Sequence, residues 1–300
     1  MLHVLSIKKK SVILHDIDKI NISKNFYWID VSNPTSEELN KIIEKTKLIQ
    51  HDLKCALDRR EKPRIDKKDK YSLIIFRSVS KTSITPIGII ISKNFVMTIH
   101  REEILSLQTL MEEETPNDVN KIVYEIFSGL IKEFSQNLED IEDRLDKIEE
   151  KAIRAESNMG QIFALKKNII YLRKALSGDR EVVEHIISGA IPILKNKTLF
   201  NMLFIELSQL IDTEELIKDR LTGVLEVHLS SISNKLNEVM KSFTVIASLL
   251  LIPMLISGIY GMNFRVLPLS QHDYGFWFSL GFMLITVVLM LLFFKIRKWL

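Results

Sequence analysis

Two long runs without a charged residue, both close to the C-terminal end, limit what this chain can fold into. One extends from Ser242 to Met262 and the other from Phe276 to Phe294. At 1.5 Å per residue, a helix of either length is about 30 Å long, which matches the hydrocarbon core of a bilayer. A single run of this kind could also be a buried core helix. Two adjacent runs, with Tyr260, Tyr274 and Trp277 near one end, instead predict a hairpin of two membrane-spanning helices with an aromatic interface.

Basic residues flank the two spans on one side. They are Lys235, Lys241, Lys295, Arg297 and Lys298, whereas the connection contains only Arg265. By the positive-inside rule, we expect both termini in the cytoplasm and the connection outside. The predicted segments are a span 242–262, an external loop 263–275, a second span 276–294 and a cytoplasmic tail 295–300. The expected protein is therefore a multi-pass protein of the cell (plasma or inner) membrane, with the lipid bilayer as one partner.

The rest of the composition excludes several classes of protein. The 41 Lys and Arg nearly balance the 38 Asp and Glu, and a formal charge of +3 is too small for a typical nucleic-acid-binding protein. We therefore expect no nucleic acid among the partners. Cys55 is the only cysteine, which excludes a disulfide within the chain. The sequence has neither a phosphate-binding P-loop nor a GxGxxG motif, so we expect no ATP-driven pumping. The chain is also not expected to be an enzyme.

Residues 1–115 combine β-rich runs with helical stretches and predict an α+β domain. The strand candidates are Ser11–His15, Phe26–Val31, Tyr71–Ser80, Ile84–Ile91 and Phe95–Ile99. The segment Asn33-Pro34-Thr35, followed by Glu37 and Glu38, predicts a helix start. The amphipathic helix that begins there is expected to run to about Gln50.

Residues 116–196 predict an antiparallel helical hairpin. Its two apolar stripes are Leu138, Ile141, Leu145, Ile148 and Ala152, and Ile162, Leu165, Ile169, Leu172 and Leu176. The segment 157–160 is the predicted turn between the arms. The first arm is also rich in acids, namely Glu139, Asp140, Glu142, Asp143, Asp146, Glu149 and Glu150. These acids form either a solvated face or an acidic collar that concentrates cations near the membrane.

Residues 197–241 predict a stalk helix that continues into the first span, so that one helix extends from about Leu199 to Met262. Its apolar stripe is Leu225, Leu229, Ile232, Leu236, Val239 and Phe243. A second, mostly polar stripe is Glu226, Ser230, Ser233, Asn237, Met240 and Thr244. Polar residues that enter a bilayer must face protein or water, because lipid offers them no hydrogen bonds. Two spans cannot enclose a channel, so we expect a ring of several copies with this stripe facing its axis.

The residues that end the first span, Tyr260-Gly261-Met262-Asn263-Phe264, resemble the signature of the CorA family of magnesium and cobalt transport proteins. Further stretches resemble the same family in the same order: Trp28-Ile29-Asp30-Val31, 51–58 (HDLKCALD), 61–65 (EKPRI), 233–241 (SNKLNEVMK) and Lys298-Trp299-Leu300. The resemblance covers essentially the whole chain. It implies a homopentamer with a cytoplasmic α/β funnel domain, a long pore-lining stalk helix and two C-terminal transmembrane helices, the second outside the first.

The resemblance also implies roles for single residues. Gly261, Met262 and Asn263 would form the selectivity filter, in which Asn263 ligates the hydrated ion and Gly261 permits close backbone approach. The pore-lining residues would be Asn237, Met240, Thr244, Leu251 and Met254, and apolar rings among them could gate by dewetting. Glu226 would be a regulatory cation ligand. On the residues alone, Asn263 could also be a helix C-cap, Asn237 could fix a helix register, and Glu226 could be a simple surface charge.

The connection between the spans departs from the acidic Met-Pro-Glu-Leu type of the family. Here the sequence is Leu267-Pro268-Leu269-Ser270, Arg265 adds a positive charge near the mouth, and Asp273 is the only acid. We expect a passive, potential-driven channel for hydrated divalent cations, gated by cytoplasmic cations. Magnesium is the expected cargo and regulatory ligand, with cobalt or nickel as surrogates. The alternatives are a zinc-transporting relative of the same fold and a non-transporting, membrane-anchored assembly protein.

Overall fold

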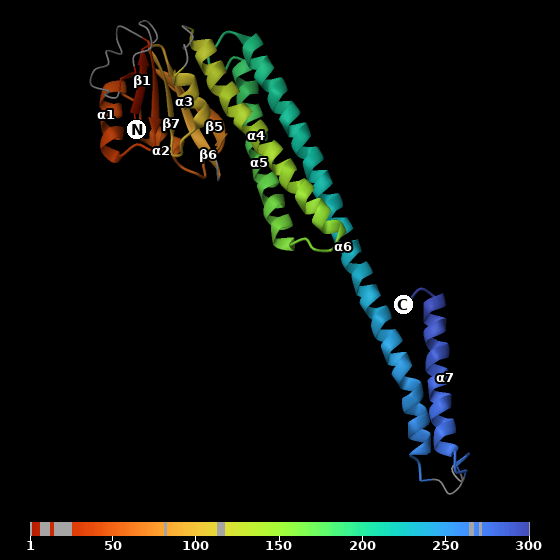
Figure 1. Cartoon of the computed structure of the whole chain (residues 1–300). Helices are drawn as coiled ribbons and strands as arrows, with labels where there is room; N and C mark the ends of the chain where they lie inside the picture. The colour runs from red at the N-terminus through yellow and green to blue at the C-terminus, as the bar shows by residue number, and fades with distance from the viewer. Residues whose placement is uncertain are drawn as a thin grey trace. The chain divides into compact units, whose positions relative to one another are not determined.

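The computed structural model describes residues 2–6, 13–14, 26–80, 83–112, 118–263, 267–269 and 272–299. The chain divides into two compact units, and Figure 1 shows the helices and strands of both. The first unit comprises Met1–Glu150 and Asn158–Val224. The second comprises Lys151–Ser157 and Leu225–Leu300.

The first unit is built around a mixed sheet. Its strands are β1 Leu2–Ser6, β2 Ile13–Leu14, β3 Tyr27–Ser32, β4 Arg64–Lys67, β5 Tyr71–Val79, β6 Ile84–Ser92 and β7 Phe95–His100. Their order across the sheet is β2-β1-β3-β7-β6-β5-β4. Only β3 and β7 pair in parallel among these strands, with Tyr27 opposite Phe95 and Ser32 opposite His100. The α+β fold class predicted for residues 1–115 is confirmed.

Four of the predicted strands are present within two residues of their expected bounds, as β3, β5, β6 and β7. The candidate Ser11–His15 contains β2, and residues 11, 12 and 15 lie outside the described residues. Two strands were not predicted, β1 and β4. β4 has the sequence RIDK, and four mostly charged residues at a sheet edge give no alternating apolar pattern to detect.

The first helix begins where the sequence predicts it. The Thr35 side chain accepts a hydrogen bond from the Glu38 N–H, and the Glu38 carboxylate accepts one from the Thr35 N–H, which completes a capping box. The predicted extension to Gln50 is wrong, because α1 (Ser36–Thr46) ends at Lys47, whose φ of 57° is left-handed. A separate helix, α2 (Gln50–Ala56), follows.

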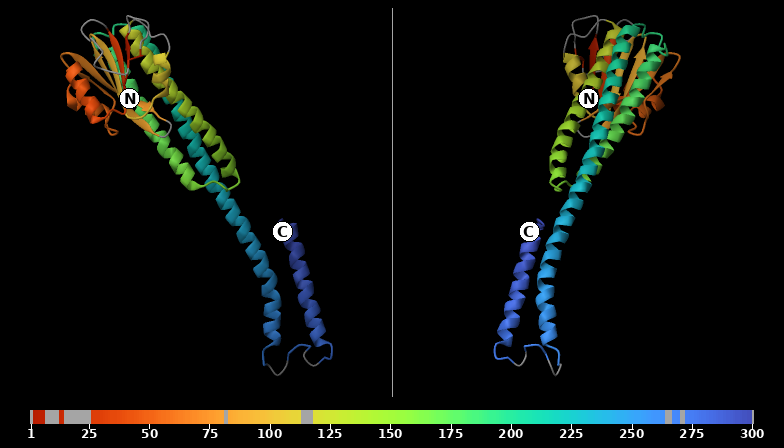
Figure 2. Two further views of the ribbon diagram at one scale, coloured as in Figure 1. Left: turned by 60° about the vertical axis from the view of Figure 1, so that its left-hand side comes forward. Right: turned by 90° about the vertical axis from the view of Figure 1, so that its right-hand side faces the viewer.

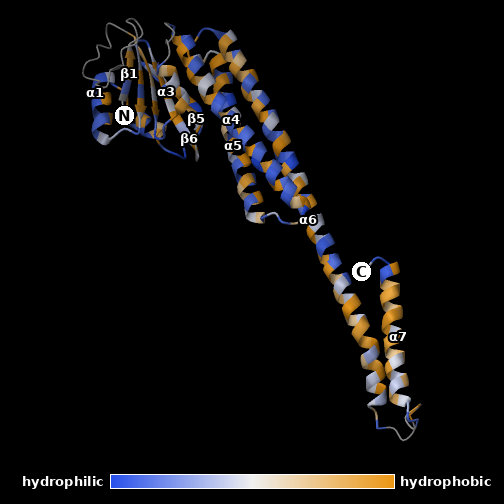
Figure 3. Cartoon of the chain, viewed as in Figure 1, coloured by the Kyte–Doolittle hydropathy of each residue, from blue (hydrophilic) through white to orange (hydrophobic). Residues whose placement is uncertain are grey.

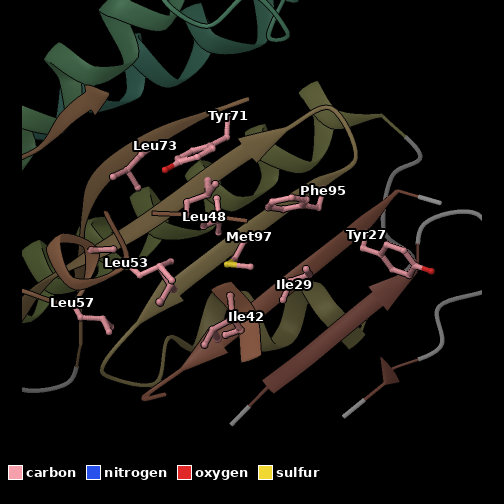
Figure 4. Close-up of a cluster of buried hydrophobic side chains, with 14 of the residues drawn as sticks. Tyr27, Ile29, Ile42, Leu48, Leu53, Leu57, Tyr71, Leu73, Phe95 and Met97 are labelled. Carbon is pink, nitrogen blue, oxygen red and sulfur yellow. The ribbon is translucent and has the colours of Figure 1, made fainter. Parts of the chain in front are cut away.

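Helices α1 and α2 cover one face of the sheet. The buried cluster there takes alternate residues of three strands, including Ile29 from β3, Leu73 from β5 and Met97 from β7 (Figure 4). Helix α2 contacts β6 and β7. A Cβ atom added at Gly88 on β6 would lie 2.4 Å from the Ala56 Cβ, so this close approach of α2 requires glycine.

The opposite face carries a buried polar network beneath the long helices. The Thr98 hydroxyl accepts from the Trp28 indole N–H at 3.2 Å and donates to Asp30, while His100 Nε2 lies 3.0 Å from the same Asp30 oxygen. Nearby, the rings of Phe76 on β5 and Phe127 on α4 (Val119–Ile153) have centroids 4.7 Å apart. The Trp28-Ile29-Asp30 stretch therefore supports the fold rather than a site.

Helices α4 and α5 (Met159–Ile187) form the predicted antiparallel hairpin, which Figure 2 shows from two sides. All ten residues of the two apolar stripes are buried. Asn158 caps α5, because its side-chain oxygen accepts from the Gly160 N–H at 2.8 Å. A short helix, α3 (Leu105–Glu112), precedes α4 and was not predicted.

The second unit contains the C-terminal part of α6 (Lys197–Tyr260) and α7 (Gly275–Ile296). Helix α6 is continuous, as predicted, and Pro253 lies inside it. Both helices contain a stretch long and apolar enough to cross a membrane, which Figure 3 shows as orange segments. Beyond α7, the Trp299 ring stacks on Phe294 with centroids 5.8 Å apart.

Candidate ion pathway along helix α6

The residues proposed for the pore lie on two columns of α6, each with a seven-residue repeat. One column is Glu226, Ser233, Met240, Ala247, Met254 and Gly261, and the other is Ser230, Asn237, Thr244, Leu251 and Gly258. Because seven residues of a straight α-helix fall about 20° short of two turns, the first column drifts by about 100° and the second by about 80° over its length. A left-handed supercoil removes this drift and keeps both columns on one side of each helix.

Both columns are exposed over the length of the predicted span. The exposed fractions are 63% for Met240, 64% for Leu251 and 72% for Met254. By contrast, Val245 on another face of α6 is buried, and so is Phe294 of α7. The described part of the chain therefore leaves the pathway residues free to face an axis or a second copy.

Three of the predicted pore residues meet at one hollow in the second unit. Asn237, Met240 and Thr244 line a space of about 540 Å³ together with Asn234, Glu238, Lys241 and Trp299. The Thr244 hydroxyl donates to the Met240 carbonyl at 2.8 Å, so its oxygen can still accept a hydrogen bond. Sequence reasoning missed Trp299 as a neighbour of Asn237, because 62 positions separate them and no local pattern joins them.

The predicted selectivity filter directly follows the end of α6. The Gly261 N–H donates to the Ser257 carbonyl at 2.9 Å, and the Met262 N–H donates to the Ile259 carbonyl at 3.2 Å. These two bonds close the helix end, and Asn263 follows as an exposed residue. A Cβ atom at Gly261 would lie 3.3 Å from the Ser257 oxygen, so glycine relieves a tight backbone contact here.

The described part of the connection folds back tightly before α7 begins. Leu269, in the position where the family pattern has a carboxylate, has a left-handed φ of 61°. The His272 N–H donates to the Leu269 carbonyl at 3.3 Å, and the Gly275 N–H donates to the His272 carbonyl at 2.9 Å. Asp273 is exposed beside them, whereas Arg265 lies outside the described residues.

Part of the acidic arm is paired with a base of the first unit. Arg220 on α6 lies 3.1 Å from Glu142, 2.7 Å from Asp146 and 3.0 Å from Glu149. The hydrogen bonds that Arg220 donates to Asp146 and Glu149 raise the pKa of its guanidinium. These three acids therefore brace α4 against α6, which limits their use as a cation collar.

Glu226 is exposed and lies 11 positions before Asn237 on the same helix, about 16 Å away along its axis. The structure thus brings Asn237, Met240 and Thr244 together, and keeps Glu226 and Asn263 apart from them. Within the described ranges, no three His, Cys, Asp or Glu side chains lie close enough together to hold a metal ion. A cation on this helix would therefore be held by neutral oxygens or between copies.

Comparison with known proteins places this arrangement in a family. Residues 23–297 match the family model described as CorA-like Mg2+ transporter protein. The cobalt/magnesium transport protein CorA of Methanocaldococcus jannaschii is 29% identical over the full length of both chains. The protein of the same name from Thermotoga maritima is 28% identical over 83% of this chain and 76% of its own length.

A solved structure gives the same result for the fold. The complete structure of the CorA magnesium transporter from Methanocaldococcus jannaschii superposes with a TM-score of 0.88 at 27% identity. The match covers 100% of this chain and 99% of that one. The α/β domain, the long helix and the two C-terminal apolar helices are therefore a known architecture.

Proposed function

Because the chain belongs to the CorA-like Mg2+ transporter family, we propose that it is a passive channel through which hydrated magnesium crosses the membrane. Members of this family are transporters and not enzymes, and divalent-cation transport is the activity that membership supports. The finer proposal has four parts: the pathway, the assembly, the driving force and the control of opening.

The proposed pathway is supported by the two exposed columns of α6 from Asn237 to Gly261, which Asn263 follows. It contains amide and hydroxyl oxygens, two glycines and apolar side chains, and neither span contains a carboxylate. Magnesium gives up its water shell reluctantly, so a path without charged ligands favours passage of the hydrated ion. Neutral oxygens at Asn263 can accept hydrogen bonds from that water shell without trapping the ion.

The proposed assembly is a ring of five copies around this column. Two spans in one chain cannot enclose a pathway, and the apolar stripe of α6 is open to solvent in a single copy. Leu229 is 53% exposed, Leu236 60% and Phe243 66%. A neighbouring copy that covers this stripe would bury it and leave the polar column toward the axis.

The membrane potential is a sufficient driving force for this channel. Each elementary charge that crosses 100 mV changes its free energy by about 2.3 kcal/mol, so a divalent ion that moves to a negative interior gains about 4.6 kcal/mol. That gain corresponds to a concentration ratio of more than 10³ at equilibrium. No ATP-binding motif is required.

Control of opening is assigned to Glu226, the acid on the exposed column. A cytoplasmic divalent ion could bridge this carboxylate to a neighbouring copy and hold the ring closed. Met240, Leu251 and Met254 would then form apolar rings that exclude water in the closed state. If Glu226 is instead a simple surface charge, Glu226→Ala leaves the magnesium concentration that closes the channel unchanged.

Flux into proteoliposomes tests the proposal. Magnesium and zinc are compared under an inside-negative potential, for the parent and for Asn263→Ala. We expect magnesium uptake to be lost in this variant, because five ligands disappear, while the assembly stays intact since Asn263 is exposed. Asn263→Asp should keep some transport with altered ion choice. Asn201→Ala, an exposed asparagine near the start of α6, is the matched control.

Two results would overturn the assignment. If Asn263→Ala assembles and transports magnesium at the parent rate, Asn263 is not the filter. If the parent transports zinc in strong preference to magnesium, the zinc-transporting alternative is correct. That alternative rests on Leu269, which stands where the family pattern has a carboxylate.

A further inference from the structure

The first unit contains a second feature, a cleft of about 680 Å³ lined by basic residues. It lies between the loop 57–63, the ends of β5 and β6, and the facing sides of α4 and α5. Arginines enter it from three elements: Arg59 and Arg60 from the loop, Arg77 from β5 and Arg144 from α4. Lys62, Lys167 and Lys174 add three more positive charges.

No acidic side chain is among the described residues that line this cleft. Two other arginines of the same unit are matched by acids: Arg220 contacts three carboxylates, and Arg173 contacts Glu214 at 2.7 Å and Glu215 at 3.5 Å. At the cleft, Arg59 pairs with Glu102 at 3.1 Å, and Asp179 and Asp58 act on the charge of Arg77. Within the described part of the chain, five basic residues of the cleft have no ion pair: Arg60, Lys62, Arg144, Lys167 and Lys174. In a chain with a formal charge of +3, this is a local excess of positive charge that an anion would balance.

The walls of the cleft are fixed by contacts within the fold. A Cβ atom at Gly178 on α5 would lie 2.7 Å from the Pro63 Cγ, so the loop is pressed against the helix. The buried Asp179 carboxylate accepts from the Arg77 N–H at 2.9 Å, which ties β5 to α5. The Arg77 guanidinium donates to the backbone carbonyls of Arg59 and Glu61, so it holds the loop in place. A fixed cleft spares a ligand the cost of ordering it.

The cleft also offers groups that could contact the uncharged part of a ligand. Tyr171 is 53% exposed on α5, and the Lys167 ammonium lies 5.7 Å from its ring centroid. Asn137 and Asn168 line the same space and supply amide donors and acceptors. The volume is in the range of sites that hold whole small molecules rather than single ions.

We propose that this cleft binds a small anion that contains two or more linked phosphate groups. Arginine forks bind phosphate oxygens in pairs, and the five bases of the cleft without an ion pair match an extended chain of negative charge better than one compact anion. Both a nucleoside triphosphate and inorganic polyphosphate have this chemistry. The exposed Tyr171 ring separates them, because only a nucleotide has a base to stack on it.

Calorimetric titration of the intact protein in detergent tests this inference, with the sodium salts of ATP, tripolyphosphate and orthophosphate as ligands. ATP and tripolyphosphate should bind at least tenfold more tightly than orthophosphate. The double variant Arg60→Gln, Arg144→Gln should weaken the binding of ATP and of tripolyphosphate by at least tenfold, since it removes two exposed positive charges. Higher salt should weaken binding as well.

The matched control changes another basic hollow by the same charge. Lys67→Gln, Lys70→Gln removes two lysines from a space of about 610 Å³ near the start of α4 and should change affinity less than twofold. Tyr171→Ala should weaken ATP alone if the ligand is a nucleotide, and neither ligand if it is inorganic polyphosphate. Equal effects of the two double variants on affinity would overturn the inference. The absence of binding would also overturn it, and that is the result expected if a neighbouring copy fills the cleft.

Discussion

Assembly through the apolar stripe of α6 makes a prediction that can be worked from exposed surface. Leu236 lies on this stripe and is 60% exposed in the single copy. Leu236→Ala removes most of the side chain and keeps the helix, because alanine is the best helix former. The variant should therefore weaken contact between copies without a change in the fold of each copy.

The size of the effect follows from the area available for burial. Full burial of a leucine side chain is worth about 1.5–3 kcal/mol, so covering 60% of its surface is worth about 1–2 kcal/mol per contact. One copy that leaves a ring breaks two contacts, which gives about 2–4 kcal/mol. At about 1.4 kcal/mol per factor of ten, the ring should dissociate at a protein concentration about 30- to 700-fold higher than that of the parent.

Native mass spectrometry in mild detergent, over a dilution series, measures this shift directly. Leu105→Ala is the matched control, because Leu105 is 71% exposed on α3 and lies outside the stripe. If Leu236→Ala and Leu105→Ala both dissociate over the same range as the parent, the stripe is not the contact between copies. A parent that is already monomeric at high concentration would refute the ring itself.

Three further predictions concern control, the connection and stability. Glu226→Ala should raise the cytoplasmic magnesium concentration that halves flux about two- to fivefold, because one exposed charge contact contributes about that much to binding. If the concentration that halves flux into proteoliposomes is unchanged, another residue senses the cation. Gly275→Ala should destabilise the protein by about 1–3 kcal/mol, because the new Cβ would lie 2.0 Å from the Leu269 oxygen. The control is Gly281→Ala on the same helix, where a Cβ meets nothing within 4 Å, and it should leave thermal unfolding in detergent unchanged. Burial raises the pKa of Asp179 well above its usual value, so the folded state holds that proton more tightly, and the stability of the first unit should fall as pH rises from about 4 toward the raised pKa. Asp179→Asn keeps an acceptor for the Arg77 N–H and should remove this fall, so parallel unfolding curves against pH for parent and variant would contradict the assignment.

The long elements of this fold could be predicted because each repeats one simple pattern many times. The two uncharged runs, the stripes of the α4–α5 hairpin and the continuity of α6 all depend on ten or more residues, so no single position decides them. The short elements were missed for the opposite reason. The break between α1 and α2 depends on Lys47 alone, and a left-handed lysine has no sequence signal comparable to glycine or asparagine.

The sites divide in the same way. The column from Glu226 to Gly261 is visible in the sequence because one helix carries all of it. The hollow at Asn237 and the basic cleft are not, because tertiary structure joins Trp299 to α6 and brings Arg60, Arg144 and Lys174 together from three elements. Charge counted along the sequence is nearly balanced, and only the fold shows where it is unbalanced.

The charge of the connection between the spans bears on where ion choice can be made. Residues 263–275 contain one base, Arg265, and one acid, Asp273, so their formal charges cancel in every copy of a ring. A neutral connection produces little long-range attraction for a divalent ion, and salt would screen what remains within about 8–10 Å.

Under the proposed function, cations therefore reach the mouth by diffusion rather than by electrostatic steering, and discrimination between ions depends on short-range contacts. Asn263 is the exposed amide just beyond the end of α6, and its neighbours Gly261 and Met262 offer backbone oxygens but no charge. Ion choice in this chain would thus depend on how well neutral oxygens fit the water shell of the ion. Zinc and magnesium satisfy this geometric criterion to different degrees, because magnesium holds its water shell more rigidly.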